Sequence, residues 1–298
     1  MISRHTWHSF VITAYKDLEN LERLIGRLQA RNNVFLHIDA SSSMIRDEDV
    51  ARFNELPNVY AEKRYAISWG SYKHLLSLLG LTRKAIEHTE AEGYIHLISG
   101  QDIPIRSDEE FEEFFSGNRH IYMDCRTIEE MEPHQRAMYQ WKNRLWRYDY
   151  WNKVVHALRN VDIALQKTLH LANDNFGGER NLAQGLVWMS LPVEASQYVI
   201  DFVDGHPRFM RDLYQAQIPE EFLFQTVLVN SPYAGNIVSD NLRYMDWHKR
   251  NGSLPAYLDE SDYSKAMESG CFFARKIDSG ISKEFLHMCG YDMDGAGQ

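Results

Sequence analysis

Short apolar runs alternate with amphipathic stretches along the first hundred residues, and this alternation constrains the fold more than any other feature of the chain. Four of the runs have the length and composition of buried strands: 9–15, 34–38, 58–61 and 94–99. Between them, leucines at helical spacing predict helices that begin at Asp17 and at Ser71. Strands that alternate with helices predict an α/β fold with a doubly wound, mainly parallel sheet and helices on both of its faces.

The second half of the chain is less regular. A strand is predicted over 186–191, a helix over 193–202 and a turn over 176–178. The segment 139–151 is dense in aromatic and basic residues, so it could form a packed helix, a membrane-surface face or the wall of an acceptor site. No repeat or linker interrupts the chain, which favours a single domain over residues 1–298.

Composition narrows the partners and the compartment. A formal net charge of -10 argues against nucleic-acid binding. The three cysteines, Cys125, Cys271 and Cys289, have no metal-ligand spacing, and so few thiols fit a reducing compartment. The chain shows no apolar signal segment and no run of eighteen apolar residues. We therefore expect a cytoplasmic protein with possible peripheral membrane contact.

Polar residues follow two of the predicted strands, where ligands bind in open α/β sheets. Asp39 ends the second strand, and Asp102 lies in the loop after the fourth. Asp39 could instead be a turn or cap residue. His37 is expected in the core, and Trp69 could line a pocket or fill the core, of which the core is favoured.

A basic pair, Arg275 and Lys276, follows an apolar run near the end of the chain. In a partly buried strand such a pair needs an anion, which in an acidic protein suggests a small phosphorylated ligand. The alternative is a strand end with two solvated cations. Because neighbouring strand residues point to opposite faces, only one of the two side chains is expected to face a given ligand.

An acidic pair, Glu220 and Glu221, follows Pro219 in the first turn of a predicted helix. The helix dipole favours carboxylates there, so simple capping electrostatics could explain them. A general base is the alternative, and it must be ionised and reach a hydroxyl group. Adjacent helical residues point about 100° apart, so only one carboxylate is expected to face a site.

Taken in order, these segments resemble the core-2/I-branching β-1,6-N-acetylglucosaminyltransferases, a family that also includes peptide O-xylosyltransferases and bacterial members. The resemblance extends from about residue 8 to about residue 288, and it rests on the ordered set of motifs rather than on any one of them. The motifs occupy residues 35–39, 67–70, 94–105, 218–225, 242–247 and 272–278.

The resemblance implies a GT-A-like fold with a nucleotide-binding half at about 8–124 and an acceptor and catalytic half at about 125–290. It implies inverting transfer of a sugar, by default N-acetylglucosamine, from a UDP-sugar to a hydroxyl group of a carbohydrate or glycolipid. Alternatives are a UDP-xylose-dependent or other UDP-hexose-dependent transferase and a non-catalytic sugar-binding protein of the same fold. Because this chain lacks the membrane anchor of the animal members, we expect a bacterial enzyme.

The resemblance also implies roles for individual residues. Glu221 corresponds to the catalytic base, with Glu220 beside it on the acceptor side, and Lys276 corresponds to a lysine that binds the diphosphate, with Arg275 next to it. Donor-binding residues are Thr13, Ala14 and Tyr15 after the first strand, Asp39 at the uridine, and Asp102 near the donor sugar. Trp247 corresponds to an aromatic residue at the acceptor, and Lys249 replaces a further aromatic.

The family uses basic side chains instead of a metal ion, so no divalent metal or other cofactor is expected. Two acidic triplets, 47–49 and 292–294, do not follow central strands and are interpreted as solvated loop and tail residues. Animal members add an arginine before the basic motif, and its position here is ambiguous among four cations: Arg243, Lys249, Arg250 and Lys265.

Overall fold

The computed structural model describes residues 2, 5–145, 152–173, 176 and 181–291. Its largest sheet has seven strands in the order β10-β6-β9-β4-β1-β2-β3, a second sheet has the order β11-β12-β5, and β7 pairs with β8. The strands are β1 (Thr6–Ala14), β2 (Asn33–Ile38), β3 (Val59–Glu62), β4 (Thr89–Ser99), β5 (Asp102–Pro104), β6 (Ile121–Met123), β7 (Arg126–Thr127), β8 (Ala183–Gln184), β9 (Met189–Pro192), β10 (Ile237–Val238), β11 (Arg243–Met245) and β12 (Phe273–Arg275).

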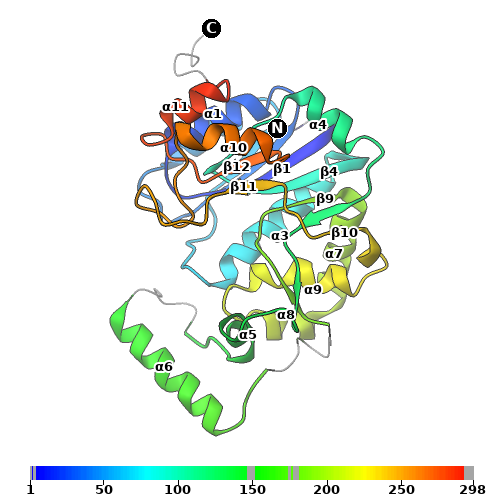
Figure 1. Cartoon of the computed structure of the whole chain (residues 1–298). Helices are drawn as coiled ribbons and strands as arrows, with labels where there is room; N and C mark the ends of the chain where they lie inside the picture. The colour runs from blue at the N-terminus through cyan, green and yellow to red at the C-terminus, as the bar shows by residue number, and fades with distance from the viewer. Residues whose placement is uncertain (1, 3–4, 146–151, 174–175, 177–180, 292–298) are drawn as a thin grey trace.

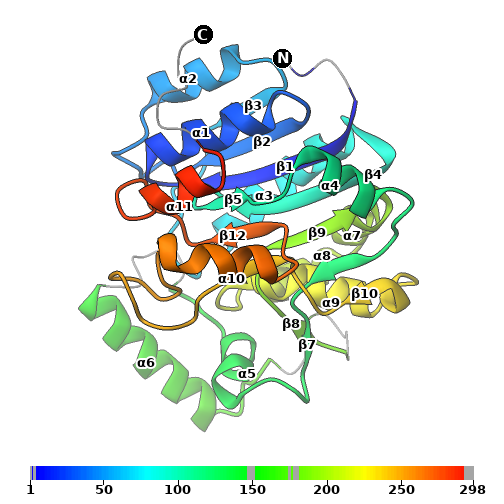
Figure 2. The same cartoon turned by 45° about the horizontal axis from the view of Figure 1, so that its top comes forward.

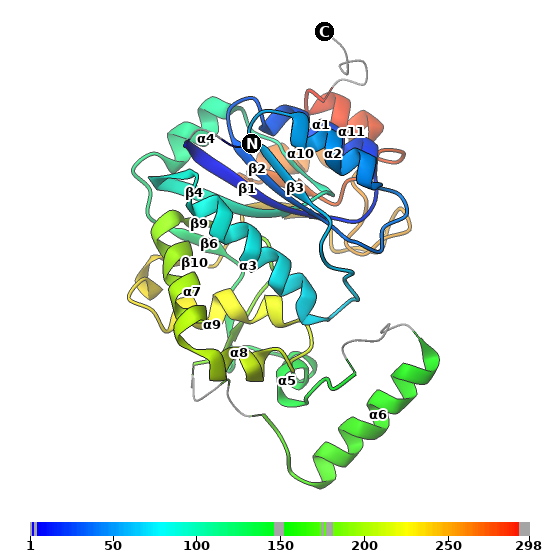
Figure 3. The same ribbon diagram turned by 180° about the vertical axis from the view of Figure 1, so that it is seen from behind.

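Helices lie on both faces of the main sheet, as Figures 1 and 3 show from opposite sides. The α-helices are α1 (Leu18–Leu28), α2 (Asp47–Glu55), α3 (Tyr72–Ile86), α4 (Asp108–Phe115), α5 (Pro133–Gln140), α6 (Lys153–Thr168), α7 (Val193–Gly205), α8 (Pro207–Leu213), α9 (Leu223–Val229), α10 (Tyr263–Glu268) and α11 (Lys283–Met288). Short 3-10 helices are η1 (Pro219–Glu221), η2 (Ala234–Asn236) and η3 (Glu260–Asp262).

The predicted doubly wound, mainly parallel sheet is confirmed. Strand β1 pairs in parallel with β2 and with β4, and β2 pairs in parallel with β3. Strand β9 is antiparallel to both of its neighbours, β4 and β6. Helix α1 begins where the sequence predicts, because the Asp17 carboxylate accepts a hydrogen bond from the Asn20 N–H at 3.1 Å.

Alternation along the strands divides the interior into two cores. Val11 of β1 packs with the leucines of α3 on one face of the sheet. Phe10 and Ile12 point to the other face, where α1 and α4 cover them. A third cluster joins the small sheet to α10 and α11, which lie beside β12 and β5 in Figure 2. The buried runs of the sequence are therefore strands that are covered on both sides.

The predicted strand over 186–191 is only partly right. Its second half lies in β9 (Met189–Pro192), and Leu186–Trp188 lie outside the regular strands, between β8 and β9. Gly185, just before this irregular segment, allows a close backbone approach, since a Cβ atom there would lie 1.6 Å from the carbonyl oxygen of Asp124. The irregular segment places Val187 and Trp188 at the cavity described below.

Two predicted segments fall partly outside the described residues. The aromatic and basic segment contains the end of α5, but 146–151 lie outside the described part, as do Gly177 and Gly178 of the predicted turn.

All three cysteines are free thiols. Within the described part of the chain, no helix has both the length and the apolar composition needed to cross a membrane. The single-domain organisation stays a prediction.

Candidate functional site

A cavity of about 470 Å³ lies at the carboxyl ends of β1, β2 and β4. Thr13, Ala14 and Tyr15 line it from the end of β1, and Asp39 lines it from the end of β2. These four residues were predicted to share a donor pocket, and the topology brings them together because adjacent parallel strands end at one edge of the sheet.

Asp39 is a turn residue that also borders the cavity. Its Oδ1 atom accepts hydrogen bonds from the backbone N–H groups of Ser41 at 2.8 Å and Ile67 at 3.2 Å, so it organises a turn and borders the cavity. His37 is fully buried, as predicted, and its Nε2 atom accepts from the Tyr65 N–H at 3.1 Å. Burial lowers the pKa of His37 to about 4, so this imidazole is neutral at pH 7.

The prediction that Trp69 fills the core is wrong. Its side chain is 47% exposed and lines the cavity together with Gly70. The loop between β3 and α3 holds both residues, and Gly70 has a φ of 74°, which suits a turn rather than a packed helix or strand. Trp69 therefore forms part of the cavity wall.

Both Glu220 and Glu221 line the cavity, although the helical geometry expected only one of them there. The difference arises because the two residues lie in η1, a single tight turn before α9, rather than in a continuous α-helix. Glu220 Oε1 lies 3.0 Å from His74 Nδ1, and Glu221 Oε2 accepts a hydrogen bond from Gln184 Nε2 at 3.1 Å. The two carboxylates therefore contact different elements: Glu220 contacts α3, and Glu221 contacts β8.

Burial and the neighbouring carboxylate of Glu220 both affect the pKa of Glu221. Burial raises the pKa of Glu221 to about 8, and the negative charge of Glu220 adds to the effect. Glu220 belongs to a chain of hydrogen-bonding groups, because His74 Nε2 lies 3.2 Å from the Thr13 hydroxyl oxygen. A carboxyl group with a pKa near neutrality, in a cavity, has the properties of a general base or acid.

Arg275 is the member of the basic pair that borders the cavity. Its Nη1 atom donates to the Asp102 carboxylate at 3.2 Å and to the Ser99 hydroxyl, and its guanidinium lies 4.4 Å from the centre of a Trp188 ring. Asp102 itself is fully buried and does not line the cavity. Asp102 lies beneath the cavity, where its carboxylate accepts the hydrogen bond from Arg275 and so orients that side chain.

Lys276, predicted to bind the diphosphate, does not line the cavity and lies in a second group of charges around Tyr257. Its Nζ atom is 3.3 Å from the Ser253 hydroxyl and 5.1 Å from the centre of the Tyr257 ring. Lys16, which lines the cavity, donates to the Tyr257 hydroxyl at 2.6 Å. Although burial opposes the effect, the hydrogen bond from Lys16 and the charge of Lys276 lower the pKa of Tyr257.

Lys16 is a cavity residue that sequence reasoning missed. The available signal was its position, directly after Thr13–Tyr15 at the end of the first strand. Burial acts to lower the pKa of Lys16, but the hydrogen bond to Tyr257 and nearby negative groups outweigh it, so the pKa is raised. The side chain is therefore a cation at pH 7.

None of the four candidate cations for the ambiguous position lines the cavity. Arg243 is buried, and its Nη2 atom donates to the carbonyl oxygens of Leu97 and Met189, both at 3.0 Å. The charge of Arg250 is matched by three carboxylates, those of Asp246, Asp259 and Asp262. The other two candidates, Lys249 and Lys265, are exposed. The predicted acceptor residue Trp247 is also exposed and lies outside the cavity lining.

The acidic triplet 47–49 is solvated at Asp47 and Glu48, as interpreted, but it forms the first turn of α2 rather than a loop. Asp49 is buried, and its carboxylate accepts a hydrogen bond from the Arg46 N–H at 2.8 Å. The triplet 292–294 lies outside the described residues. Over the residues that are described, no group of three or more His, Cys, Asp or Glu side chains is arranged to hold a metal ion.

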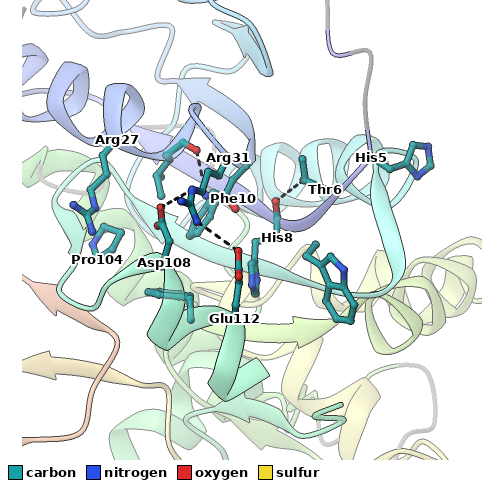
Figure 4. A pocket seen from close by; sticks show the side chains of 13 residues that line it. His5, Thr6, His8, Phe10, Arg27, Arg31, Pro104, Asp108 and Glu112 are labelled. Atoms are coloured by element: carbon teal, nitrogen blue, oxygen red, sulfur yellow. Dashed lines mark hydrogen bonds and ion pairs between the residues drawn. The ribbon is translucent and has the colours of Figure 1, made fainter. Parts of the chain in front are cut away.

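A smaller cavity of about 220 Å³ lies near the beginning of β1. Figure 4 shows Arg31 between Asp108, 3.3 Å away, and Glu112, 3.6 Å away. Because carboxylates neutralise this guanidinium, Arg31 offers little attraction for an anion. We assign this cavity no function.

The larger cavity has the position and lining that define a ligand site in an open α/β sheet: strand ends, aromatic walls and a few convergent charges. Comparison with known proteins gives a more specific identity. The family model described as Core-2/I-Branching enzyme matches residues 9–267. The chain belongs to this family, and the resemblance inferred from the sequence motifs is thereby confirmed.

Curated relatives include xylosyltransferase 2 of Canis lupus familiaris, which is 24% identical over 94% of this chain. Xylosyltransferase 1 of Rattus norvegicus is 22% identical over 93% of the chain. The matched regions are 32% and 34% of those two proteins, so the chain spans about a third of the relatives' length. The apo structure of the WbbM bifunctional glycosyltransferase matches 92% of the chain and 45% of its own, with 12% identity and a TM-score of 0.37.

Proposed function

We propose that this chain is an inverting glycosyltransferase that moves a sugar from a UDP-sugar to a carbohydrate hydroxyl group without a metal ion. The observation that carries the proposal is that Glu221, whose pKa lies near neutrality, shares one cavity with the cations Lys16 and Arg275. Membership of the Core-2/I-branching enzyme family and the xylosyltransferase relatives support the same reaction class.

In the proposed reaction, an acceptor hydroxyl oxygen attacks the anomeric carbon of the donor sugar from the face opposite the diphosphate. Glu221 takes the hydroxyl proton as the new C–O bond forms. The bond from the anomeric carbon to the diphosphate oxygen breaks, and its electron pair leaves on UDP. Lys276 and Lys16 stabilise the charge that grows on the diphosphate as this bond breaks.

The remaining cavity residues divide between donor and acceptor in this proposal. Asp39 and the loop Thr13–Tyr15 bind the uridine, and Asp102 acts through Arg275 at the donor. Glu220 lies on the acceptor side with His74. Trp247 and Lys249, exposed on the loop that also holds Ser253, contact a long acceptor beyond the cavity.

The donor sugar is the finer part of the proposal. The family's default is N-acetylglucosamine, whereas the curated relatives are xylosyltransferases. Titration calorimetry with a panel of UDP-sugars, in excess EDTA, tests the site: at least one should bind, and UDP should be released slowly on incubation. A sugar-binding protein without activity would bind a sugar and release no UDP. If no UDP-sugar binds, the assignment of the cavity is wrong.

Transfer is expected to continue in excess EDTA. Lys16 and Arg275 line the cavity, and Lys276 lies beside Tyr257, which Lys16 contacts; these cations can supply the positive charge that a divalent ion supplies elsewhere. The measurement is the initial rate of UDP release with EDTA and then with added Mn²⁺. A fall to background that Mn²⁺ reverses would contradict the metal-free mechanism.

The value of kcat/KM should rise with pH and level off above about 8, because Glu221 must be ionised to accept a proton and its pKa is about 8. Glu220→Gln removes the neighbouring negative charge that raises this pKa, so the rise should move to lower pH. Glu268→Gln is the matched control, since Glu268 is exposed on α10. A rate that falls from pH 6 to 9, or a profile that Glu220→Gln does not move, would exclude this base.

A further inference from the structure

Helix α6 (Lys153–Thr168) was not predicted from the sequence, and it lies at the periphery, away from the main sheet (Figures 1 and 3). Its contacts with the body are polar. Gln166 is fully buried and bonds with both the N–H and the carbonyl oxygen of Lys142, each at 2.9 Å. Asp162 forms an ion pair with Arg144 at 3.2 Å. Hydrogen bonds and an ion pair therefore attach α6 to the rest of the protein.

The apolar side of α6 faces outward. Val154, Leu158, Val161 and Leu165 are 52–68% exposed, and Leu169 follows the helix with a similar exposure. The spacing of these residues puts them on one stripe along the helix. A surface helix of a globular protein normally turns such a stripe toward the core, so its exposure here indicates an external partner.

The charge around the stripe indicates the chemistry of that partner. Residues 139–171 hold six Lys and Arg against two Asp, in a chain whose formal net charge is -10. Lys153 and Lys167 of α6 are exposed, and the Lys167 Nζ atom lies 5.6 Å from the centre of a Trp141 ring. A basic helix with an exposed apolar stripe and nearby tryptophan matches the helices that lie in the interface of anionic bilayers.

We propose that α6 is an interfacial helix that docks this protein on the surface of an anionic lipid bilayer. A second copy of the chain is the less suitable occupant for two reasons. Two copies would bring one positive segment against another, and one helix stripe is small beside the roughly 1,000 Å² of total area that a specific protein interface buries. A bilayer accepts the apolar side chains and attracts the lysines at the same time.

The docked orientation has a consequence for the cavity. Helix α6 and the loop 63–71, which carries Trp69 at the cavity wall, lie on the same side of the molecule in Figures 1 and 3. Docking through α6 would hold that side near the lipid head groups. Docking through α6 therefore favours an acceptor that is linked to lipid, an inference that rests on the proposed function.

The test is co-sedimentation of the full chain with vesicles of phosphatidylcholine alone and of an equimolar mixture with phosphatidylglycerol. Wild type should partition to the mixed vesicles, and added salt should weaken the binding. Leu158→Gln with Leu165→Gln should reduce partitioning roughly tenfold or more. Glutamine keeps the helix propensity of leucine, so α6 should persist. Lys153→Gln with Lys167→Gln should reduce binding to the anionic vesicles by roughly tenfold.

The matched control is Met44→Gln with Met288→Gln, which removes two exposed apolar side chains outside α6 and should bind vesicles like wild type. Equal loss in this control, or no loss in the leucine variant, would overturn the proposal. So would a concentration-dependent dimer in sedimentation that the leucine variant dissociates, because a second copy would then cover the stripe. UDP release from a UDP-sugar in water should be unchanged in the α6 variants, which separates this inference from the activity of the cavity.

Discussion

Glu221→Gln is expected to lower the transfer rate by roughly 10²–10⁴, because general-base catalysis contributes about that factor. The amide keeps the shape of the side chain and its place beside Gln184, but it cannot accept the acceptor's proton. Affinity for the UDP-sugar should change little, since the base acts on the acceptor hydroxyl. Initial rates of UDP release with acceptor, together with calorimetric titration of the donor, measure the two effects separately.

Glu220→Gln is the natural comparison, because Glu220 lines the same cavity and contacts His74 instead. Its effect on the rate at pH 8 or above should be smaller. A larger loss in Glu220→Gln than in Glu221→Gln would transfer the role of base to Glu220. Wild-type turnover in Glu221→Gln would remove the base assignment altogether.

Lys276→Ala should weaken UDP binding more than uridine binding. Loss of a charge-assisted contact costs about 1.5–3 kcal/mol, or roughly one to two decades in affinity, and only UDP carries the diphosphate. Lys16→Ala should act in the same direction, because Lys16 and Lys276 both contact Tyr257. Calorimetric titration of each variant with uridine and with UDP gives the ratio of its two dissociation constants.

Lys265→Ala removes an exposed lysine on α10 outside the cavity, so it controls for the general loss of positive charge. If Lys276→Ala weakens uridine and UDP equally, Lys276 supports the fold rather than the diphosphate. The transfer rate should also fall in Lys276→Ala, because the leaving group gains negative charge as the bond breaks.

The sheet could be predicted because its strands are buried on both faces. Runs such as Val34–Ile38 are apolar at all positions but His37, and the leucines of α3 repeat at helical spacing. Helix α6 was not predicted from the sequence, because the segment around it is irregular and basic and its apolar residues form an outward-facing stripe. The irregular start of the predicted strand 186–191 was also missed, since the Asp124 backbone that approaches Gly185 belongs to a distant part of the chain.

At the candidate site, the location of a residue could be predicted where its position along a strand decides it. Asp39 and Thr13–Tyr15 meet in one cavity because their strands are neighbours and parallel. Lys16 could not be singled out, because its contact with Tyr257 joins residues far apart in sequence. The burial of Asp102 under Arg275 depends likewise on the pairing of β5 with β12.

The central claim is that this cavity transfers a sugar with inversion, using Glu221 as the base. Proton NMR of a UDP-sugar incubated with the protein tests it directly, by following UDP and the first anomer of the released or transferred sugar. From an α-linked donor, the account predicts UDP and a β-configured product with wild type, and a rate lower by roughly 10²–10⁴ with Glu221→Gln. An α-configured first product, or equal rates from the two proteins, would contradict it.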